Sequence, residues 1–255
     1  MSRPKGNRRD GILKFGKAPA KADLRNLKFS AVLKAPVALP PEYDFDVRHN
    51  GIPTPMFGND QYGDCVMAGR AHQTLRFETS EQGVLIDITD KDVLREYLKE
   101  TGGEDTGLVV LDSLKLWRKS GWLAAKTRYK IKAFAQIDQT SRQEIKRAVF
   151  MDIGVGLGFV LPDSAITQFH AGKRWEVVSG PGSRPNPDNG HYVYVPGYTT
   201  IGPVCVTWGR KQQMTWSFLA KYSDEAYAII DAVDTPKKKR GLDAKKIDEF
   251  LASAK

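Results

Sequence analysis

Residues 54–77 read TPMFGNDQYGDCVMAGRAHQTLRF, and this stretch passes from a loop into a helix at Cys65. Prolines and glycines make residues 51–64 a loop. From Cys65 onward apolar residues recur at helical spacing through Phe77, with Asp64 at the N-cap position. Unpaired amides and the helix dipole at such a start favour a thiolate, so Cys65 is a candidate nucleophile. The alternative is that Cys65 is a small buried apolar residue, as free cysteines often are.

A cysteine nucleophile needs a base, and the chain has four histidines. His191 follows an Asn-Gly pair and opens the apolar run of residues 192–195, where its ring can point into a cleft. His72 lies two turns along the same predicted helix as Cys65, roughly 10 Å away, which is too far for a base. We therefore expect the fold to bring His191 to Cys65.

The two halves of the sequence differ in periodicity. Besides the helix that starts at Cys65, helices are predicted from Asp90, over residues 109–119 and from Ser141. Strands are predicted over residues 155–161, 192–195, 204–208 and 226–230. Short elements are predicted as a helix near 23–29, a strand or extended segment over 43–48, and a helix over 243–253. Helices followed by strands indicate an α+β protein of two packed layers.

The positive charge of the chain is concentrated at its ends. Residues 1–34 hold ten Lys and Arg against two Asp, a net charge of +8, and residues 237–255 have a net charge of +4. Because the whole chain has a net charge of +9, the residues between these ends have a net charge of −3. We expect a basic N-terminal arm over residues 1–37 and a basic C-terminal tail over residues 236–255. These ends either contact nucleic acid or partner proteins in a larger assembly, or only aid solubility.

Composition excludes several classes of protein. No apolar run is long enough to cross a bilayer, and the basic N-terminus precedes no apolar stretch, so neither a membrane span nor a secretory signal is expected. Two cysteines, Cys65 and Cys205, make no disulfide framework and no zinc pattern. We expect no metal and no cofactor, and a location in the cytoplasm or within a macromolecular assembly such as a virus particle.

Four motifs, in the correct order, resemble those of papain-like cysteine peptidases. Residues 39–48 (LPPEYDFDVR) are similar to the start of the mature family, and residues 54–65 are similar to the stretch that ends at the nucleophile. Residues 190–198 (GHYVYVPGY) resemble the strand that carries the catalytic histidine. Residues 206–209 with Trp216 resemble the family's N-S-W-G-x-x-W-G. Residues 106–122 resemble a family helix between them.

The resemblance covers about residues 38–231 and implies a papain-like two-lobed α+β fold in a domain of residues 38–235. The helical N-terminal lobe would span about residues 50–135. The antiparallel β-sheet-rich C-terminal lobe would span about residues 136–235.

The resemblance also implies a thiol protease that hydrolyses peptide or amide bonds of a peptide or protein substrate. Cys65 would be the nucleophile, and His191 its general base and later its acid. The oxyanion-hole glutamine of the family falls on Asn59, which offers the same amide on a side chain one methylene shorter. Gln61 is the alternative donor.

The chain departs from the family at several positions. The Asn that orients the histidine falls on Val206, and the neighbouring Thr207 is the candidate to take over its hydrogen bond. Asp64 places a carboxylate beside the sulfur, which would raise the pKa of the thiol. The arm is shorter than the family's inhibitory propeptide, and we expect no such role for it. These departures favour the alternative, a weak or inactive papain-fold protein with a structural or binding role.

Overall fold

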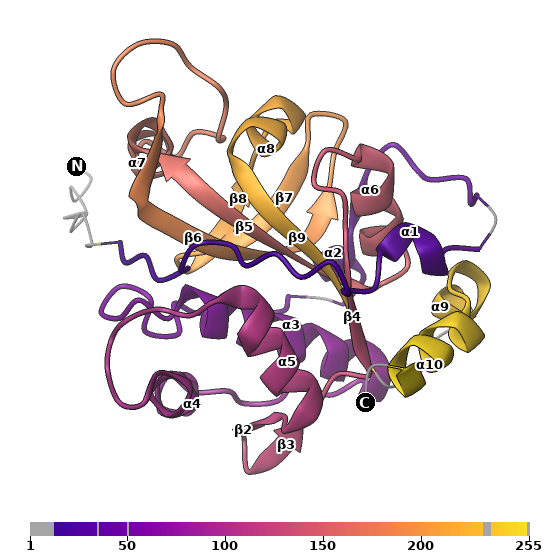
Figure 1. Cartoon of the computed structure of the whole chain (residues 1–255). Helices are drawn as coiled ribbons and strands as arrows, with labels where there is room; N and C mark the ends of the chain where they lie inside the picture. Colours follow the sequence, from indigo (N-terminus) through magenta and orange to yellow (C-terminus); the bar gives the residue numbers. More distant parts are fainter. Residues whose placement is uncertain (1–12, 35, 50, 232–235, 254–255) are drawn as a thin grey trace, which may run out of the picture.

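Helices and strands separate into two halves of the molecule, as Figure 1 shows for the computed structural model. The structure describes residues 13–34, 36–49, 51–231 and 236–253. The lower half in Figure 1 contains α3 (Cys65–Gln82), α4 (Asp90–Thr101) and α5 (Val110–Lys119). The upper half contains the main sheet, covered on its outer side by α6 (Arg142–Phe150), α7 (Asp163–His170) and α8 (Trp216–Tyr222). The predicted α+β class is confirmed.

The central helix α3 is enclosed by protein along most of its length. Every side chain from Cys65 to Glu78 is buried, because the sheet packs on one side of the helix and α4 on the other. The helix ends at Gly83, whose φ of 69° suits glycine. Asp64 occupies the N-cap position of α3, as predicted, but its side chain makes no capping hydrogen bond. The helix predicted from Asp90 begins at that residue, and the side chain of Thr89 caps it.

The main sheet is antiparallel at every pairing. Its order is β4-β9-β5-β6-β7-β8, with β1 added on β6. The strands are β1 (Tyr43–Asp44), β4 (Ala133–Gln136), β5 (Gly154–Pro162), β6 (Pro185–Tyr198), β7 (Pro203–Thr207), β8 (Arg210–Gln213) and β9 (Ser223–Ile230). A separate hairpin, β2 (Trp122–Ala124) with β3 (Thr127–Tyr129), belongs to the helical half. Each predicted strand of the C-terminal half is present, and most are longer than predicted.

The segment of residues 43–48 was predicted as a strand or extended segment, and the structure corrects this. Only Tyr43 and Asp44 pair with β6, and one helical turn follows, α2 (Phe45–Arg48). The physical reason is that the Asp44 carboxylate accepts hydrogen bonds from the backbone N–H groups of Asp46 and Val47, which caps the turn.

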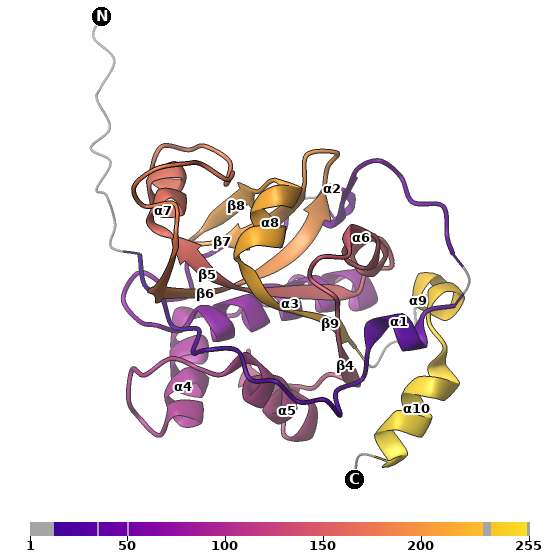
Figure 2. The same cartoon turned by 45° about the horizontal axis from the view of Figure 1, so that its top comes forward.

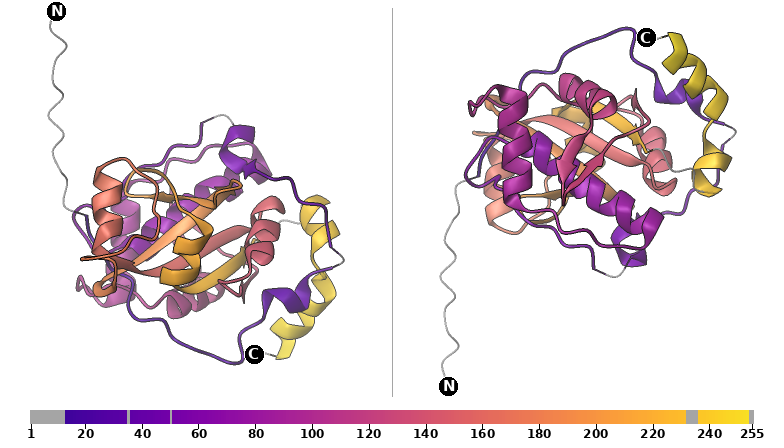
Figure 3. Two further views of the ribbon diagram at one scale, coloured as in Figure 1. Left: turned by 90° about the horizontal axis from the view of Figure 1, so that it is seen from above. Right: turned by 90° about the horizontal axis from the view of Figure 1, so that it is seen from below.

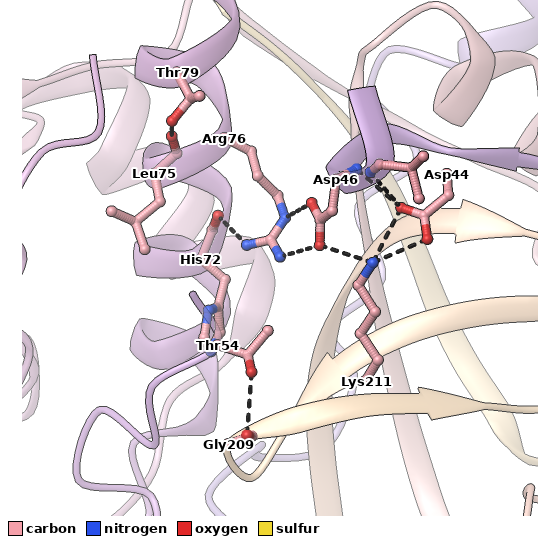
Figure 4. A network of polar contacts seen from close by, with 10 residues as sticks. Asp44, Asp46, Thr54, His72, Leu75, Arg76, Thr79, Gly209 and Lys211 are labelled. Carbon is pink, nitrogen blue, oxygen red and sulfur yellow. Dashed lines mark hydrogen bonds and ion pairs between the residues drawn. The ribbon is translucent and has the colours of Figure 1, made fainter. Parts of the chain in front are cut away.

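A buried charge network joins α3 to the sheet (Figure 4). The guanidinium of Arg76 donates to both carboxylate oxygens of Asp46 at 2.8 and 2.7 Å. Lys211 of β8 lies 3.1 Å from Asp46 and 2.9 Å from Asp44. The network therefore connects the helical half to the far edge of the sheet through α2.

The described part of the arm, residues 13–34, lies along the junction between the two halves (Figures 1 and 2). It pairs through single bridges at Lys17 with Leu108, Lys28 with Gln136, and Leu33 with Leu242. The helix predicted near residues 23–29 falls instead at α1 (Phe29–Val32). Residues 1–12 of the arm lie outside the described residues.

The C-terminal tail forms two helices, α9 (Pro236–Gly241) and α10 (Ala244–Ser253), of which the second was predicted. They lie beside α1 in the views from above and below (Figure 3). Leu242 and Ile247 are buried there, and the Gly241 carbonyl accepts from the Lys34 N–H. Residues 29–34 of the arm are thus packed against the C-terminal tail.

Candidate active site

Cys65 begins α3, at the end of the loop that contains residues 51–64. Positive φ angles at Phe57 and Gly58, 56° and 85°, turn this loop sharply before the helix. The helix N-terminus therefore points its free N–H groups toward the junction of the two halves. The Cys65 side chain is buried, with 1% of its surface exposed.

His191 lies in β6, opposite Phe159 of β5. Its Nε2 atom lies 2.6 Å from the hydroxyl oxygen Oγ1 of Thr207 on β7. The ring of Trp208 stacks on the imidazole, with centroids 4.0 Å apart and planes inclined by 15°. These contacts fix the ring plane and leave Nδ1 without a hydrogen bond within the described residues.

The two candidate oxyanion donors lie in different surroundings. Asn59 is buried, and its Nδ2 donates to the carbonyl of Tyr62 at 3.1 Å. Gln61 is exposed on the loop. Only Asn59 lines the cavity that contains the sulfur of Cys65.

One small cavity brings the candidate residues together. Cys65, Asn59, His191 and Thr207 all line a space of about 10 Å³, together with Val206 and Trp208. A cavity of that volume is at the lower limit for a single water molecule. The four side chains line one cavity, and no substrate fits into it in this form of the protein.

The reason for the small volume is that residues 13–18 cover the site; we call them the covering segment. Phe15 packs edge-on against His191 and Trp208, with centroid distances of 5.9 and 5.6 Å. The indole N–H of Trp208 donates to the carbonyl of Lys14 at 3.2 Å. The arm was expected to be too short to act as an inhibitory propeptide, and the structure nevertheless places residues 14–16 against the site.

Hydrogen bonds to the backbone hold the covering segment on both sides. The N–H groups of Gly16 and Lys17 donate to the Gly190 carbonyl at 3.1 and 3.0 Å. On the helical side, the Leu108 N–H donates to the Gly16 carbonyl at 2.7 Å, and the Ala18 N–H to the Leu108 carbonyl at 2.9 Å. These bonds depend on no particular side chain, so six residues suffice to cover the site.

The segment fits because glycines line its path. A Cβ on Gly190 would lie 2.1 Å from the Lys17 carbonyl oxygen, and one on Gly107 would lie 2.4 Å from that of Gly16. A Cβ on Gly63 would lie 2.6 Å from the carbonyl oxygen of Phe15. Glycine is therefore required wherever the two backbones approach.

Burial keeps both reactive groups neutral in this covered form. Burial raises the pKa of the Cys65 thiol to about 12, while hydrogen bonds from the backbone N–H groups of Tyr192 and Gly16 act in the opposite direction. Burial lowers the pKa of His191 to about 3. The pair is thus a thiol beside a neutral imidazole near neutral pH.

Asp64 is fully buried beside the sulfur, and its carboxylate oxygens accept no hydrogen bond of ordinary length from the described residues. Burial raises the pKa of this carboxyl to about 8. We expected a charged carboxylate there. Near neutral pH most of the Asp64 population is instead protonated, so its repulsion of a thiolate is weaker than the sequence suggested.

Three residues at the site were missed in the sequence. Phe15 and Trp208 enclose the imidazole, and His72 lines the same cavity, where its ring packs on Phe57 with centroids 4.8 Å apart. His72 was set aside because of its distance along α3. The covering segment has no side-chain periodicity that could have indicated its position.

The described residues contain neither a cluster of metal ligands nor a membrane-spanning helix. No three His, Cys, Asp or Glu side chains gather there in a way that could hold a metal ion. None of the helices in the described part of the chain has the length and apolar character of a membrane span.

Comparisons with known proteins define the class of the fold. No family model and no curated protein sequence matches this chain. Xylellain, a cysteine protease from Xylella fastidiosa, is similar over 90% of this chain and 100% of its own, with a TM-score of 0.67 and 16% identity. The Carica candamarcensis cysteine protease CMS1MS2, in complex with E-64, is similar over 76% and 99%, with a TM-score of 0.58 and 13% identity.

A third structure, procathepsin B S9 from Trypanosoma congolense, is similar over 88% of both chains, with a TM-score of 0.57 and 12% identity. The chain therefore has the fold of papain-like cysteine proteases, as its motifs predicted. At these identities the likeness concerns the fold, and the chemistry depends on the residues at the junction of the two halves.

Proposed function

We propose that the protein is a papain-type thiol hydrolase that cleaves peptide or amide bonds, and that the structure represents a closed form. The observation that carries the proposal is the common cavity of Cys65, His191, Asn59 and Thr207. A cysteine at a helix start, a histidine and an amide in one place are the groups that acyl transfer through a thiol requires.

In the open form, the Cys65 thiol gives its proton to Nδ1 of His191, and the sulfur attacks the substrate carbonyl carbon. For this, Nε2–H of His191 must donate to Thr207 Oγ1, which selects the tautomer with a free Nδ1. The oxyanion is bound by the Cys65 N–H and by Asn59 after Asn59 Nδ2 leaves the Tyr62 carbonyl. His191 then returns the proton to the leaving amine, and water hydrolyses the thioester.

Opening means displacement of the covering segment. Exposure to water removes the burial that raises the pKa of Cys65 and lowers the pKa of His191, so the two values move toward each other. The free N–H groups at the start of α3 then favour the thiolate. A closed form with neutral groups and an open form with an activated thiol are both consistent with this geometry.

A peptidase assay tests the proposal. Hydrolysis of a mixed fluorogenic peptide library is measured for the full chain and for the Cys65→Ala and Cys205→Ala variants, with thermal unfolding as the control for folding. We expect Cys65→Ala to abolish hydrolysis, and Cys205→Ala, a change at a buried cysteine of β7, to preserve it in the folded fraction. Hydrolysis that survives in Cys65→Ala would refute the assignment.

The second candidate is a non-catalytic papain-fold protein with a binding or structural role. It is favoured by the buried Asp64 beside Cys65 and by the basic cluster of Lys34, Lys132 and Lys239 around a 240 Å³ cavity beside the C-terminal tail. This cluster would bind a polyanion or an acidic partner. Nucleic-acid binding that weakens with salt, in a protein that hydrolyses no peptide, would support this candidate instead.

A further inference from the structure

We propose that the site takes a Lys or Arg side chain of its substrate into an acidic pocket formed by Asp224 and Glu225, which Lys17 fills in this structure. This inference rests on the proposed function and deepens it, because it names the class of substrate. The pocket opens directly beside the cavity of Cys65 and His191, since Lys17 is bound to Gly190, the residue before His191.

The covering segment shows how an extended peptide binds at this place. Lys17 is held at its N–H by Gly190 on the sheet side, and the residues before and after it are held by Leu108 on the helical side. Because backbone hydrogen bonds hold Lys17 and both of its neighbours, the backbone alone determines where the Lys17 side chain points. Any extended peptide that makes the same bonds would present one side chain to the same pocket.

The pocket is built for a long cationic side chain. Lys17 is 1% exposed, and its Nζ lies 2.8 Å from Asp224 Oδ2 and 3.4 Å from Glu225 Oε1. The wall is Gly158 of β5, where a Cβ would lie 2.4 Å from Cε of Lys17 and 2.5 Å from Cγ of Glu225. Any larger residue at position 158 would close the pocket.

The charge balance of the pocket favours a cation when Lys17 leaves. Two carboxyl groups face one ammonium, and Glu225 is 4% and Asp224 28% exposed, so withdrawal of Lys17 leaves one buried and one partly exposed carboxyl group without their counter-ion. Asp224 Oδ1 has no hydrogen-bond partner among the described residues. A guanidinium, with five donors against the three of an ammonium, can use this additional acceptor.

Burial raises the pKa of Glu225 to about 7, and Lys17 opposes that shift. An apolar side chain in place of Lys17 would remove the opposing charge, and the pocket would then have to take up a proton or water. A Lys or Arg side chain avoids this cost, which is the physical basis of the preference.

Protection of Cys65 from alkylation tests the inference without any need for hydrolysis. The full chain carrying Phe15→Ala and Lys17→Ala lacks the two side chains that anchor the covering segment, so that a peptide can compete for its place, and iodoacetamide labelling of Cys65 is followed by peptide mass spectrometry. The probes are two amidated tetrapeptides with the sequence of residues 15–18, one with Lys and one with norleucine at the position of Lys17. Norleucine keeps the length of the side chain and removes the charge.

We expect the Lys peptide to protect Cys65 at a concentration at least about tenfold lower than the norleucine peptide, and the preference to disappear when Asp224→Asn and Glu225→Gln are added. Equal protection by the two peptides, or protection by neither at millimolar concentration, would overturn the inference. If this double variant does not fold, Glu225→Gln in the otherwise unchanged chain replaces it. That change should speed Cys65 labelling by weakening the docking of Lys17, and an unchanged rate would overturn the inference.

The outcome separates the two proposals. If the protein shows the binding preference but hydrolyses no peptide, the acidic pocket is supported and the proposed function is refuted. If the protein hydrolyses peptides without basic residues as fast as peptides with them, the proposed function is supported and the acidic pocket is refuted as a substrate site.

Discussion

The Nε2 atom of His191 lies 2.6 Å from the hydroxyl oxygen of Thr207. In the proposed reaction, this hydroxyl takes the place of the orienting asparagine, where the chain has Val206. A hydroxyl both accepts and donates hydrogen bonds, so it can hold the imidazole in the tautomer that the proposed reaction needs.

Thr207→Val should therefore reduce kcat by about 10- to 100-fold, because the ring loses its partner and samples the wrong tautomer. Thr207→Ser keeps the hydroxyl and should retain most of the activity. The measurement is kcat and its pH profile for both variants. A Thr207→Val protein with an unchanged pH profile and rate would show that the contact has no positioning role.

Phe15→Ala should expose the site while the rest of the arm stays bound. The loss of the edge-on contacts with His191 and Trp208 removes the aromatic part of the cover, and Cys65 labelling by iodoacetamide should accelerate by about tenfold or more. Leu24→Ala is the matched control, because Leu24 belongs to the same arm and is 94% exposed. Equal acceleration in the two variants would indicate general loosening of the arm instead.

Asp64→Asn tests the electrostatic effect of the carboxyl beside Cys65. Its pKa of about 8 in the folded protein lies far above the ordinary value, so the folded state binds the extra proton and stability falls as the pH rises from the ordinary value to about 8. The slope should approach about 1.4 kcal/mol per pH unit within that window. Asn cannot ionise, and the variant should lose this slope.

The same substitution should also speed Cys65 labelling most strongly above pH 8, where the wild-type carboxylate is charged and opposes the thiolate. Urea unfolding at several pH values and labelling rates at the same values are the two measurements. A variant with the wild-type pH dependence in both would mean that Asp64 is ionised throughout.

Arg76→Met should destabilise the protein by about 3–5 kcal/mol, because Asp46 remains buried without its principal partner (Figure 4). Lys211 contacts the same carboxylate and should reduce the loss. The free energy of unfolding in urea measures the effect. Arg25→Ala, which removes an ion pair of an 88% exposed arginine, is the control and should leave the free energy of unfolding nearly unchanged, because exposed ion pairs contribute little.

Local patterns in the sequence were enough to predict the longer helices of the described residues, α3, α4, α5, α6 and α10, and the strand-rich half, whereas the shorter helices α7, α8 and α9 were not predicted. Apolar spacing marked α3, α5 and α6, a short apolar run marked β5, and a run with Ile and Tyr marked β9. The turn α2 was missed because it depends on the Asp44 carboxylate as a cap and has almost no apolar pattern. Long-range pairings such as β1 on β6 leave no local signal.

The sequence motifs predicted only those site residues that the motifs themselves contain. Residues such as Cys65 and His191 stand in runs that resemble a known family, and the structure places them in one cavity. The covering segment could not be predicted, since backbone hydrogen bonds to Gly190 and Leu108 hold it. The burial of Lys17 was equally hidden, because its acidic partners lie more than 200 positions away in the sequence.

The central claim is that His191 activates Cys65, and the rate of Cys65 alkylation in the Phe15→Ala protein tests it most directly. The account predicts that Cys65 reacts faster than Cys205, and that adding His191→Ala slows Cys65 by at least about tenfold whereas adding His170→Ala does not. If Cys65 reacts at the same rate with and without the His191 imidazole, the two residues are not a catalytic pair.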